Sequence, residues 1–257
     1  MAAALAVGAG LLLGGLSQTD PRRAVALIVA GLALGVLPLA RLLPPGTLSA
    51  KPGLPAAIAT MGLLNLGFFG VEAFIPLALV DLRGRSILFA SLTLTAVTIT
   101  WTAGSWLQAR LAGSGLRRRL VRSGLAILTA GAGGITLLLA PELPAELAPL
   151  VWGFAGVGMG LAFSTISLTV LETAPAGQEG EAASSLQLAN MLGSGLGAGI
   201  GGALIASFGP GEGLRRALTV QNVAMVGVLL LALAVAGGLP ARRATRAAEE
   251  TGSTSSV

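Results

Sequence analysis

The chain has 257 residues, of which 54% are apolar and only 11% are charged, and its mean hydropathy is +0.84. A soluble domain carries about 25% charged residues, so this composition excludes an ordinary soluble domain and indicates a membrane protein. Cys and His are both absent from the chain, which excludes disulfides, zinc–thiolate sites and cysteine nucleophiles and removes the commonest general base.

Apolar segments follow one another along the chain. The first, residues 2–16, is several residues shorter than the roughly 20 that a spanning helix needs. Seven further segments reach that length, at 24–43, 57–80, 86–109, 120–140, 147–171, 183–207 and 217–239. The polar, low-complexity end, 241–257, is predicted to be a disordered cytoplasmic tail. The pattern predicts an all-α polytopic membrane protein with about eight transmembrane helices.

Basic residues in the short loops indicate the orientation, because cytoplasmic loops carry an excess of Lys and Arg. If both termini are cytoplasmic, the larger set lies inside: Arg41, Lys51, Arg110, Arg117, Arg118, Arg119, Arg122, Arg242, Arg243 and Arg246. The smaller set then lies outside: Arg22, Arg23, Arg83, Arg85, Arg215 and Arg216. Since these bases flank apolar runs, they are typical of topology signals, and no nucleic-acid partner is expected.

Glu72 is the only charged residue in the interior of a long apolar stretch. A carboxylate at such depth costs roughly 2.5–3.5 kcal/mol or more, and intramembrane acids usually face a partner, a water-filled cavity or a transport path. Three interpretations stay open: a neutral acid bonded to a neighbouring helix, a residue that carries protons or recognises a cation, and a position near the headgroups. A low-dielectric site favours the protonated form, which suits a proton carrier.

Other polar and aromatic residues lie within the predicted spans. Asn65 precedes Glu72 by seven residues and so projects from the same face of the helix. Gln187 and Asn190 are three residues apart on another predicted helix, and Trp101 lies deep in a third. These four residues either form structural contacts between helices or line a polar translocation path.

Three glycines at four-residue spacing, Gly193, Gly197 and Gly201, lie on one face of a predicted helix. Small residues at this spacing let helix backbones approach closely in lipid. The face therefore serves either tight packing within the chain or dimerisation.

Several stretches together resemble a known family: GFFGVEAFIPLAL, GSWLQARLAGSGLRRRLVRSG, GVGMGLAFSTISLTVLE and APAGQEGEAASSLQLANMLGSGLGAGIGGAL. The region from about 53 to 239 resembles the C-terminal six-helix half of a major facilitator superfamily transporter. It is most similar to the multidrug efflux branch from high-GC bacteria. The resemblance divides the chain into two upstream helices (1–52), a six-helix transporter half (53–240) and the tail. The upstream pair resembles either the two additional helices of fourteen-helix members or the end of a first half.

The basic stretch after Gly104 resembles the family's cytoplasmic loop signature, which braces helix ends during transport. On this resemblance Gln108, Arg110 and Arg117 are gating candidates, although Gln108 stands where the family has an acidic residue. The arginines that follow, up to Arg119, complete the basic part of the signature.

The resemblance implies a proton-coupled secondary transporter that exports small amphipathic or cationic compounds across a bacterial inner membrane. Its partners would be the substrate, protons, the bilayer, and either a missing N-terminal half or a second copy of the chain. No ATP-binding G-x-x-x-x-G-K-[ST] loop is present, and neither enzymatic activity, a cofactor nor a metal is expected. The alternative is a non-transporting membrane fragment or an assembly module that docks through its glycine face.

Overall fold

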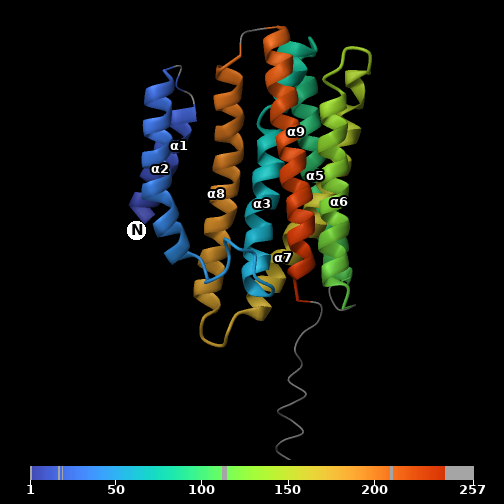
Figure 1. Ribbon diagram of the computed structural model, residues 1–257. Helices are drawn as coiled ribbons and strands as arrows, with labels where there is room; N and C mark the ends of the chain where they lie inside the picture. Colours follow the sequence, from blue (N-terminus) through green and yellow to red (C-terminus); the bar gives the residue numbers. More distant parts are fainter. Residues whose placement is uncertain (1, 17, 19, 112–114, 209–210, 241–257) are drawn as a thin grey trace, which may run out of the picture.

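Long helices run side by side along most of the chain (Figure 1). The structure is a computed structural model that describes residues 2–16, 18, 20–111, 115–208 and 211–240, and no strand occurs among them. The predicted tail, 241–257, lies outside the described residues. The helical elements are α1 (Ala2–Leu16), α2 (Pro21–Leu42), α3 (Leu54–Glu72), α4 (Ile75–Leu77), η1 (Ala78–Leu82), α5 (Ile87–Leu111), α6 (Arg117–Leu137), η3 (Ala145–Leu147), α7 (Ala148–Thr173), α8 (Glu179–Ala206), α9 (Glu212–Val235) and η4 (Ala236–Gly238).

Seven helical segments of the described chain are long and apolar enough to cross a membrane, counting α3, α4 and η1 as one segment. The apolar part of α1, Ala3–Gly15, is shorter. These findings confirm the prediction of an all-α polytopic protein with a short first helix. Prolines occupy the first turn at the starts of α2, α3 and α7. At α2, for example, Asp20 accepts a hydrogen bond from the Arg22 amide at 3.0 Å, and Pro21 occupies the first turn.

The six helices from α3 to α9 pack in a repeated pattern. In the first of two matching sets of contacts, α3 packs against α8 and α9. In the second, α7 packs against α5 and α6. α3 also packs against α7, and α6 packs against α9, so each of these contacts joins two helices at equivalent places in the pattern. Smaller contacts of α8 with α7 and α9 lie outside it. Exchanging α3, α5 and α6 for α7, α8 and α9 therefore maps the principal contacts onto themselves. One set of three helices is thus α3, α5 and α6, and the other is α7, α8 and α9. Because each of these sets has three spans, the two sets run in opposite directions.

Glycines make these contacts close. A Cβ added at Gly193 or Gly197 would meet the backbone carbonyl of Gly62 or Leu66 on α3. Between α7 and α5, a Cβ on Gly160 would likewise meet the carbonyl of Trp101. Van der Waals packing of backbones drives helix association in lipid, so these contacts hold the bundle together where hydrophobicity gives no preference.

The α1–α2 hairpin lies beside the other helices, on the α8 side of the bundle (Figure 1). Its two helices cross through Gly8 and Gly31, where an added Cβ on either glycine would meet the backbone of the other helix within 3 Å. On the bundle side, Leu13 of α1 fills the space beside Gly199 of α8. The hairpin is thus a close-packed pair whose main contact with the six-helix bundle is through α8.

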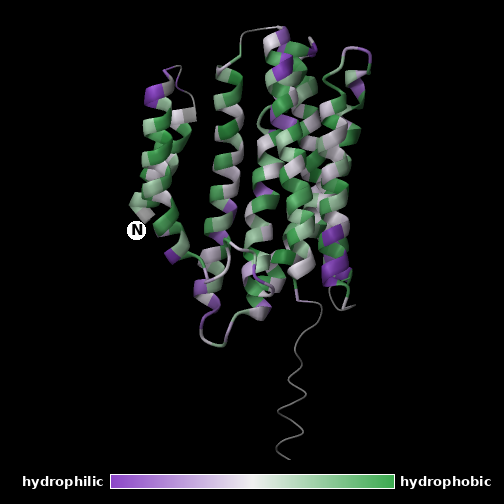
Figure 2. Cartoon of the chain, viewed as in Figure 1, coloured by the Kyte–Doolittle hydropathy of each residue, from purple (hydrophilic) through white to green (hydrophobic). Residues whose placement is uncertain are grey.

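Charged residues gather at the two ends of the bundle, and hydrophobic residues cover the shafts between them (Figure 2). We call the end at which α6 begins the basic end. Within the described residues it carries Arg41, Lys51, Arg110, Arg117, Arg118, Arg119 and Arg122, against the acids Glu172, Glu179 and Glu181. At the opposite end most bases have acidic or carbonyl partners. Arg85 pairs with Glu146 at 2.6 Å, and Arg83 donates to the carbonyls of Ala140 and Leu143.

Candidate transport site

The segment that carries Glu72 is interrupted directly after this residue. Helix α3 ends at Glu72, a turn at Ala73 and Phe74 follows, and the chain resumes as α4 and the π-helical η1. Pro76 explains the interruption, because it has no N–H for the carbonyl of Glu72, four residues earlier, and its ring clashes with that carbonyl. The predicted continuous span 57–80 is therefore a broken span, Leu54–Leu82, and Glu72, the acid in its apolar interior, lies at the break.

The Glu72 carboxylate has no partner in the described part of the chain. It forms no ion pair there, and its Oε2 atom is buried without a hydrogen bond. Helices α8 and α9 pack against the helix break beside Glu72. The ring of Phe74 lies against Gly201 of α8, and the Gln221 amide of α9 donates to the Gly70 carbonyl at 3.1 Å. The carboxylate thus lies beside a helix break that α8 and α9 hold in place.

Asn65 lies two turns before Glu72 and is fully buried. Its Nδ2 donates to the Met61 carbonyl at 2.9 Å, while its Oδ1 is buried without a partner. The Asn65 side chain borders Gly193, where α3 meets α8. The amide N–H of Asn65 is therefore hydrogen-bonded to the α3 backbone, and its Oδ1 is an acceptor without a partner inside the bundle.

Trp101 of α5 belongs to an aromatic cluster that joins α3, α5 and α7. Its ring meets Phe68 of α3 and Phe163 of α7 edge-on, each at a centroid distance of 5.5 Å. Phe68 in turn stacks on Trp152 of α7 at 5.3 Å. Trp152 is fully buried and its Nε1 has no hydrogen-bond partner in the described structure. Trp101 is only partly buried, so it forms the accessible edge of this cluster.

Gln187 and Asn190 of α8 do not join this cluster. Gln187 is exposed, and its Oε1 lies 3.5 Å from Nδ2 of Asn190, at the limit of hydrogen bonding. Neither side chain has a recorded contact with Glu72 or Asn65. The structure places the two amides on the outward face of α8 rather than against the break in α3.

A polar stripe of α5 is also exposed. Ser91, Thr95, Thr98 and Thr102 recur at spacings of four and three residues on one face, and each hydroxyl donates to a carbonyl of its own helix at 2.9–3.1 Å. On α8, which is equivalent to α5 in the repeated packing pattern, the exposed residues Ser184, Gln187, Gly195 and Gly202 form a similar stripe, interrupted by the exposed Met191.

The predicted gating residues lie at the basic end. Gln108 is buried, and Arg110 covers the Trp106 ring at 3.6 Å from its centroid, as in a cation–π contact. Arg117 pairs with Glu172 at the end of α7. The next residue, Arg118, donates through Nε to the Leu239 carbonyl at 3.0 Å, just after η4. These contacts tie the start of α6 to the ends of α7 and α9. Residues 112–114 of the connecting loop lie outside the described residues.

Sequence reasoning missed Glu172, the contact of Arg118 with Leu239, and the aromatic partners of Trp101. Only the helix break had a local signal, Pro76 inside an apolar span. The described residues contain no group of three acidic side chains placed to hold a metal ion. Comparison of the sequence with known proteins finds no matching family model and no matching curated protein.

Proposed function

We propose that this chain is one half of a proton-coupled secondary transporter of the major facilitator type. It works with a second half, either an N-terminal half or another copy of the chain, and exports small amphipathic or cationic compounds. Its place is the bacterial inner membrane, with the basic end and both termini in the cytoplasm. The observation that carries the proposal is the unpartnered carboxylate of Glu72 at the break in α3, within two matching sets of three helices.

The repeated packing supports a transporter architecture. Many secondary transporters contain inverted repeats, and three-plus-three repeats occur within each half of major facilitator proteins. Their binding sites lie near the bilayer midplane, at broken helices. Glu72 lies at such a break, and the partly buried Trp101 edge lies next to α3 through Phe68. A carboxylate and an aromatic edge are together suited to an amphipathic cation.

The exposed polar stripes support a missing second half. Hydroxyl, amide and small side chains on α5 and α8 would face lipid if the chain were alone, whereas large apolar residues normally fill that position. A second six-helix half that covers both stripes would enclose the path between the halves. Gln187 and Asn190 then line the side of that path formed by α8.

The ion pair between Arg117 and Glu172 supports a closing device at the cytoplasmic side. It joins the start of α6 to the end of α7, which belong to different sets of three helices. Closing and opening this pair would accompany rocking of the half. In this proposal Arg110 stabilises the end of α5 through Trp106 and does not contact substrate.

Efflux of a cationic dye from cells that express the chain tests the proposal. Wild-type, Glu72→Gln and Glu142→Gln chains are compared at equal membrane abundance, with and without a proton gradient. Glu142 is an exposed acid at the opposite end and serves as the matched control. We expect the wild type and Glu142→Gln to show gradient-dependent efflux, and we expect Glu72→Gln to show no efflux. Unchanged efflux by Glu72→Gln excludes this residue as the coupling group. No efflux by the wild type, also when a second half is coexpressed, favours a non-transporting membrane module.

A further inference from the structure

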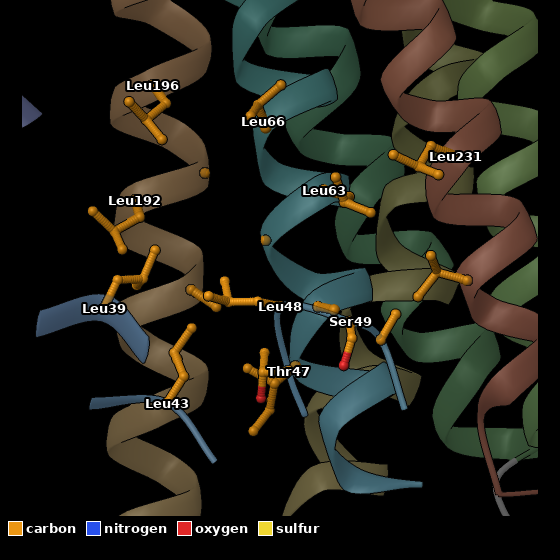
Figure 3. Close-up of a pocket in the computed structure, with 17 residues that line it drawn as sticks. Leu39, Leu43, Thr47, Leu48, Ser49, Leu63, Leu66, Leu192, Leu196 and Leu231 are labelled. Atoms are coloured by element: carbon orange, nitrogen blue, oxygen red, sulfur yellow. The ribbon is translucent and has the colours of Figure 1, made fainter. Parts of the chain in front are cut away.

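An apolar groove lies between the α1–α2 hairpin and the six-helix bundle, near the basic end (Figure 3). It encloses about 420 Å³ and is lined by leucines from several elements, among them Leu39 of α2, Leu63 of α3, Leu192 of α8 and Leu231 of α9. None of its lining residues is charged. Its size falls within the roughly 300–1,000 Å³ of small-molecule sites. The groove is open to the surroundings of the bundle, since Leu48 and Leu231 are more than half exposed.

The loop between α2 and α3 forms the rim of the groove at the basic end. Its hydroxyls fold the loop on itself: Thr47 donates to the Pro44 carbonyl at 2.7 Å and Ser49 to the Gly46 carbonyl at 3.2 Å. Ala50 has a positive φ of 48°, which a residue with a Cβ rarely adopts. Such strain persists only where the surroundings impose it.

Ala50 brings Lys51 back over the rim. The Lys51 amide donates to the Gly46 carbonyl at 3.0 Å, and the lysine methylenes lie over Gly46, where an added Cβ would meet the Cδ atom at 2.7 Å. Gly46 lines a smaller hollow of about 260 Å³ that shares Leu43, Thr47, Leu48 and Ser49 with the groove. Lys51 therefore lies against Gly46, in the wall of a hollow that adjoins the apolar groove.

Lys51 forms no ion pair within the described residues, and the sequence contains no acid between Asp20 and Glu72. The acids at this end of the bundle are Glu172, which pairs with Arg117, and Glu179 and Glu181 in the first turn of α8. Arg41 lies on the opposite face of α2, beside another hollow formed with Ala4, and is not part of this rim. An apolar chain suits the leucine lining of the groove, and an anionic group at one end of that chain suits the adjacent lysine.

We propose that this groove binds an anionic phospholipid from the leaflet at the basic end, with one acyl chain among the leucines and the phosphate beside Lys51. The acyl chain fills the space that the hairpin leaves against α3, α8 and α9, and so joins the hairpin to the bundle. The inference rests on the membrane location of the chain and on this groove, and it is independent of the proposed transport function.

Lipid retention measured by native mass spectrometry tests the proposal. Protein purified in dodecyl maltoside is mixed with phosphatidylglycerol or phosphatidylcholine of the same acyl composition, and the fraction of protein carrying one lipid is measured. A basic residue near an anionic headgroup contributes about a fivefold preference, so the wild type is expected to retain phosphatidylglycerol about fivefold better. Lys51→Gln should bring the two lipids to equal retention. Arg216→Gln, an exposed base at the other end, should leave the preference unchanged.

A second pair of variants tests the acyl groove. Ala59→Phe places a ring in the groove and should reduce retention of both lipids, whereas Ala224→Phe on the exposed face of α9 should not. If Ala59→Phe lowers the unfolding temperature more than Ala224→Phe does, Leu48→Gln at the exposed groove wall replaces it. Equal retention of the two lipids by the wild type would overturn the proposal. So would a phosphatidylglycerol preference that survives Lys51→Gln, or full retention by the groove variants.

Discussion

Gly201 of α8 lies under the ring of Phe74, the second residue of the turn that follows Glu72. The contact is closer than any Cβ would permit, and the Gln221 amide of α9 borders the same glycine. Because Gly201 has no side chain, the broken span can pack against α8 at this position. The helix break and the glycine row, which the sequence presents as separate features, form one contact.

Gly201→Ala should destabilise the protein, because its methyl group would displace the Phe74 ring. Overpacking of this kind typically costs about 1–3 kcal/mol, which should appear as a lower unfolding temperature in detergent. The control is Gly195→Ala on the same helix, where an added Cβ meets nothing within 4 Å. That variant should be neutral or slightly stabilising, since Ala is a better helix former than Gly by about 1 kcal/mol. Equal effects of the two variants would contradict this account.

The ion pair between Arg117 and Glu172 should stabilise the basic end. Their side chains are 15% and 23% exposed, between the buried and fully exposed cases. Breaking the pair by Arg117→Glu should therefore cost about 1–3 kcal/mol, and adding Glu172→Arg should recover part of the loss. Arg119→Glu is the control, because Arg119 is exposed and has no ion pair in the described structure. Unfolding temperatures are measured for the wild type, Arg117→Glu, Glu172→Arg and the double variant. Their differences give the interaction energy between the two residues, and additive effects of the single variants would exclude an interaction.

Much of the architecture could be predicted from the sequence, because runs of about 20 apolar residues between Pro-, Gly- and Arg-rich loops leave few alternatives. Helix α6 begins at Arg117, three residues before the predicted 120, because arginine is a good helix former and Arg117 and Arg118 have partners on other helices. Those partners could not be predicted. Glu172 and Leu239 lie far along the chain, and no local pattern links them to α6.

The candidate site was predictable to a smaller extent. The depth of Glu72 in an apolar run was a local signal, and Pro76 was another. The meeting of Trp101 with Phe68 and Phe163 depends on which helices pack together, and periodicity does not encode that choice. The outward position of Gln187 on α8 depends in the same way on which face of α8 meets α3.

Glu72→Gln should leave the unfolding temperature at pH 7.5 no lower than that of the wild type. The carboxylate has no recorded partner to lose, and a neutral amide is less costly to bury than an unpaired charge. Thermal unfolding in detergent gives the measurement, with Glu172→Gln as the comparison that should lower the temperature by breaking an ion pair. A marked loss of stability in Glu72→Gln would mean that the carboxylate has a structural partner.

Trp152 should tolerate Phe but not Ala. Its ring stacks on Phe68 at 5.3 Å with no exposure, so removal to Ala leaves a large cavity and costs about 3–5 kcal/mol. Trp152→Phe keeps a stacked ring and removes a buried Nε1 that has no hydrogen-bond partner. Removal of this unsatisfied N–H should offset part of the stability that is lost because Phe is smaller. Thermal unfolding of both variants provides the measurement. Equal destabilisation by Phe and Ala would indicate that Nε1 has an essential partner.

Single cysteines should report the orientation of the bundle, because the natural chain contains none to interfere. Gln178→Cys lies at the basic end and Glu142→Cys at the opposite end, and both positions are exposed. The excess of bases predicts a cytoplasmic basic end. A membrane-impermeant maleimide added to intact cells should therefore label Glu142→Cys, and label Gln178→Cys only after permeabilisation. The cysteine-free chain controls for background. The reverse pattern would invert the orientation and place Lys51 and its groove in the outer leaflet.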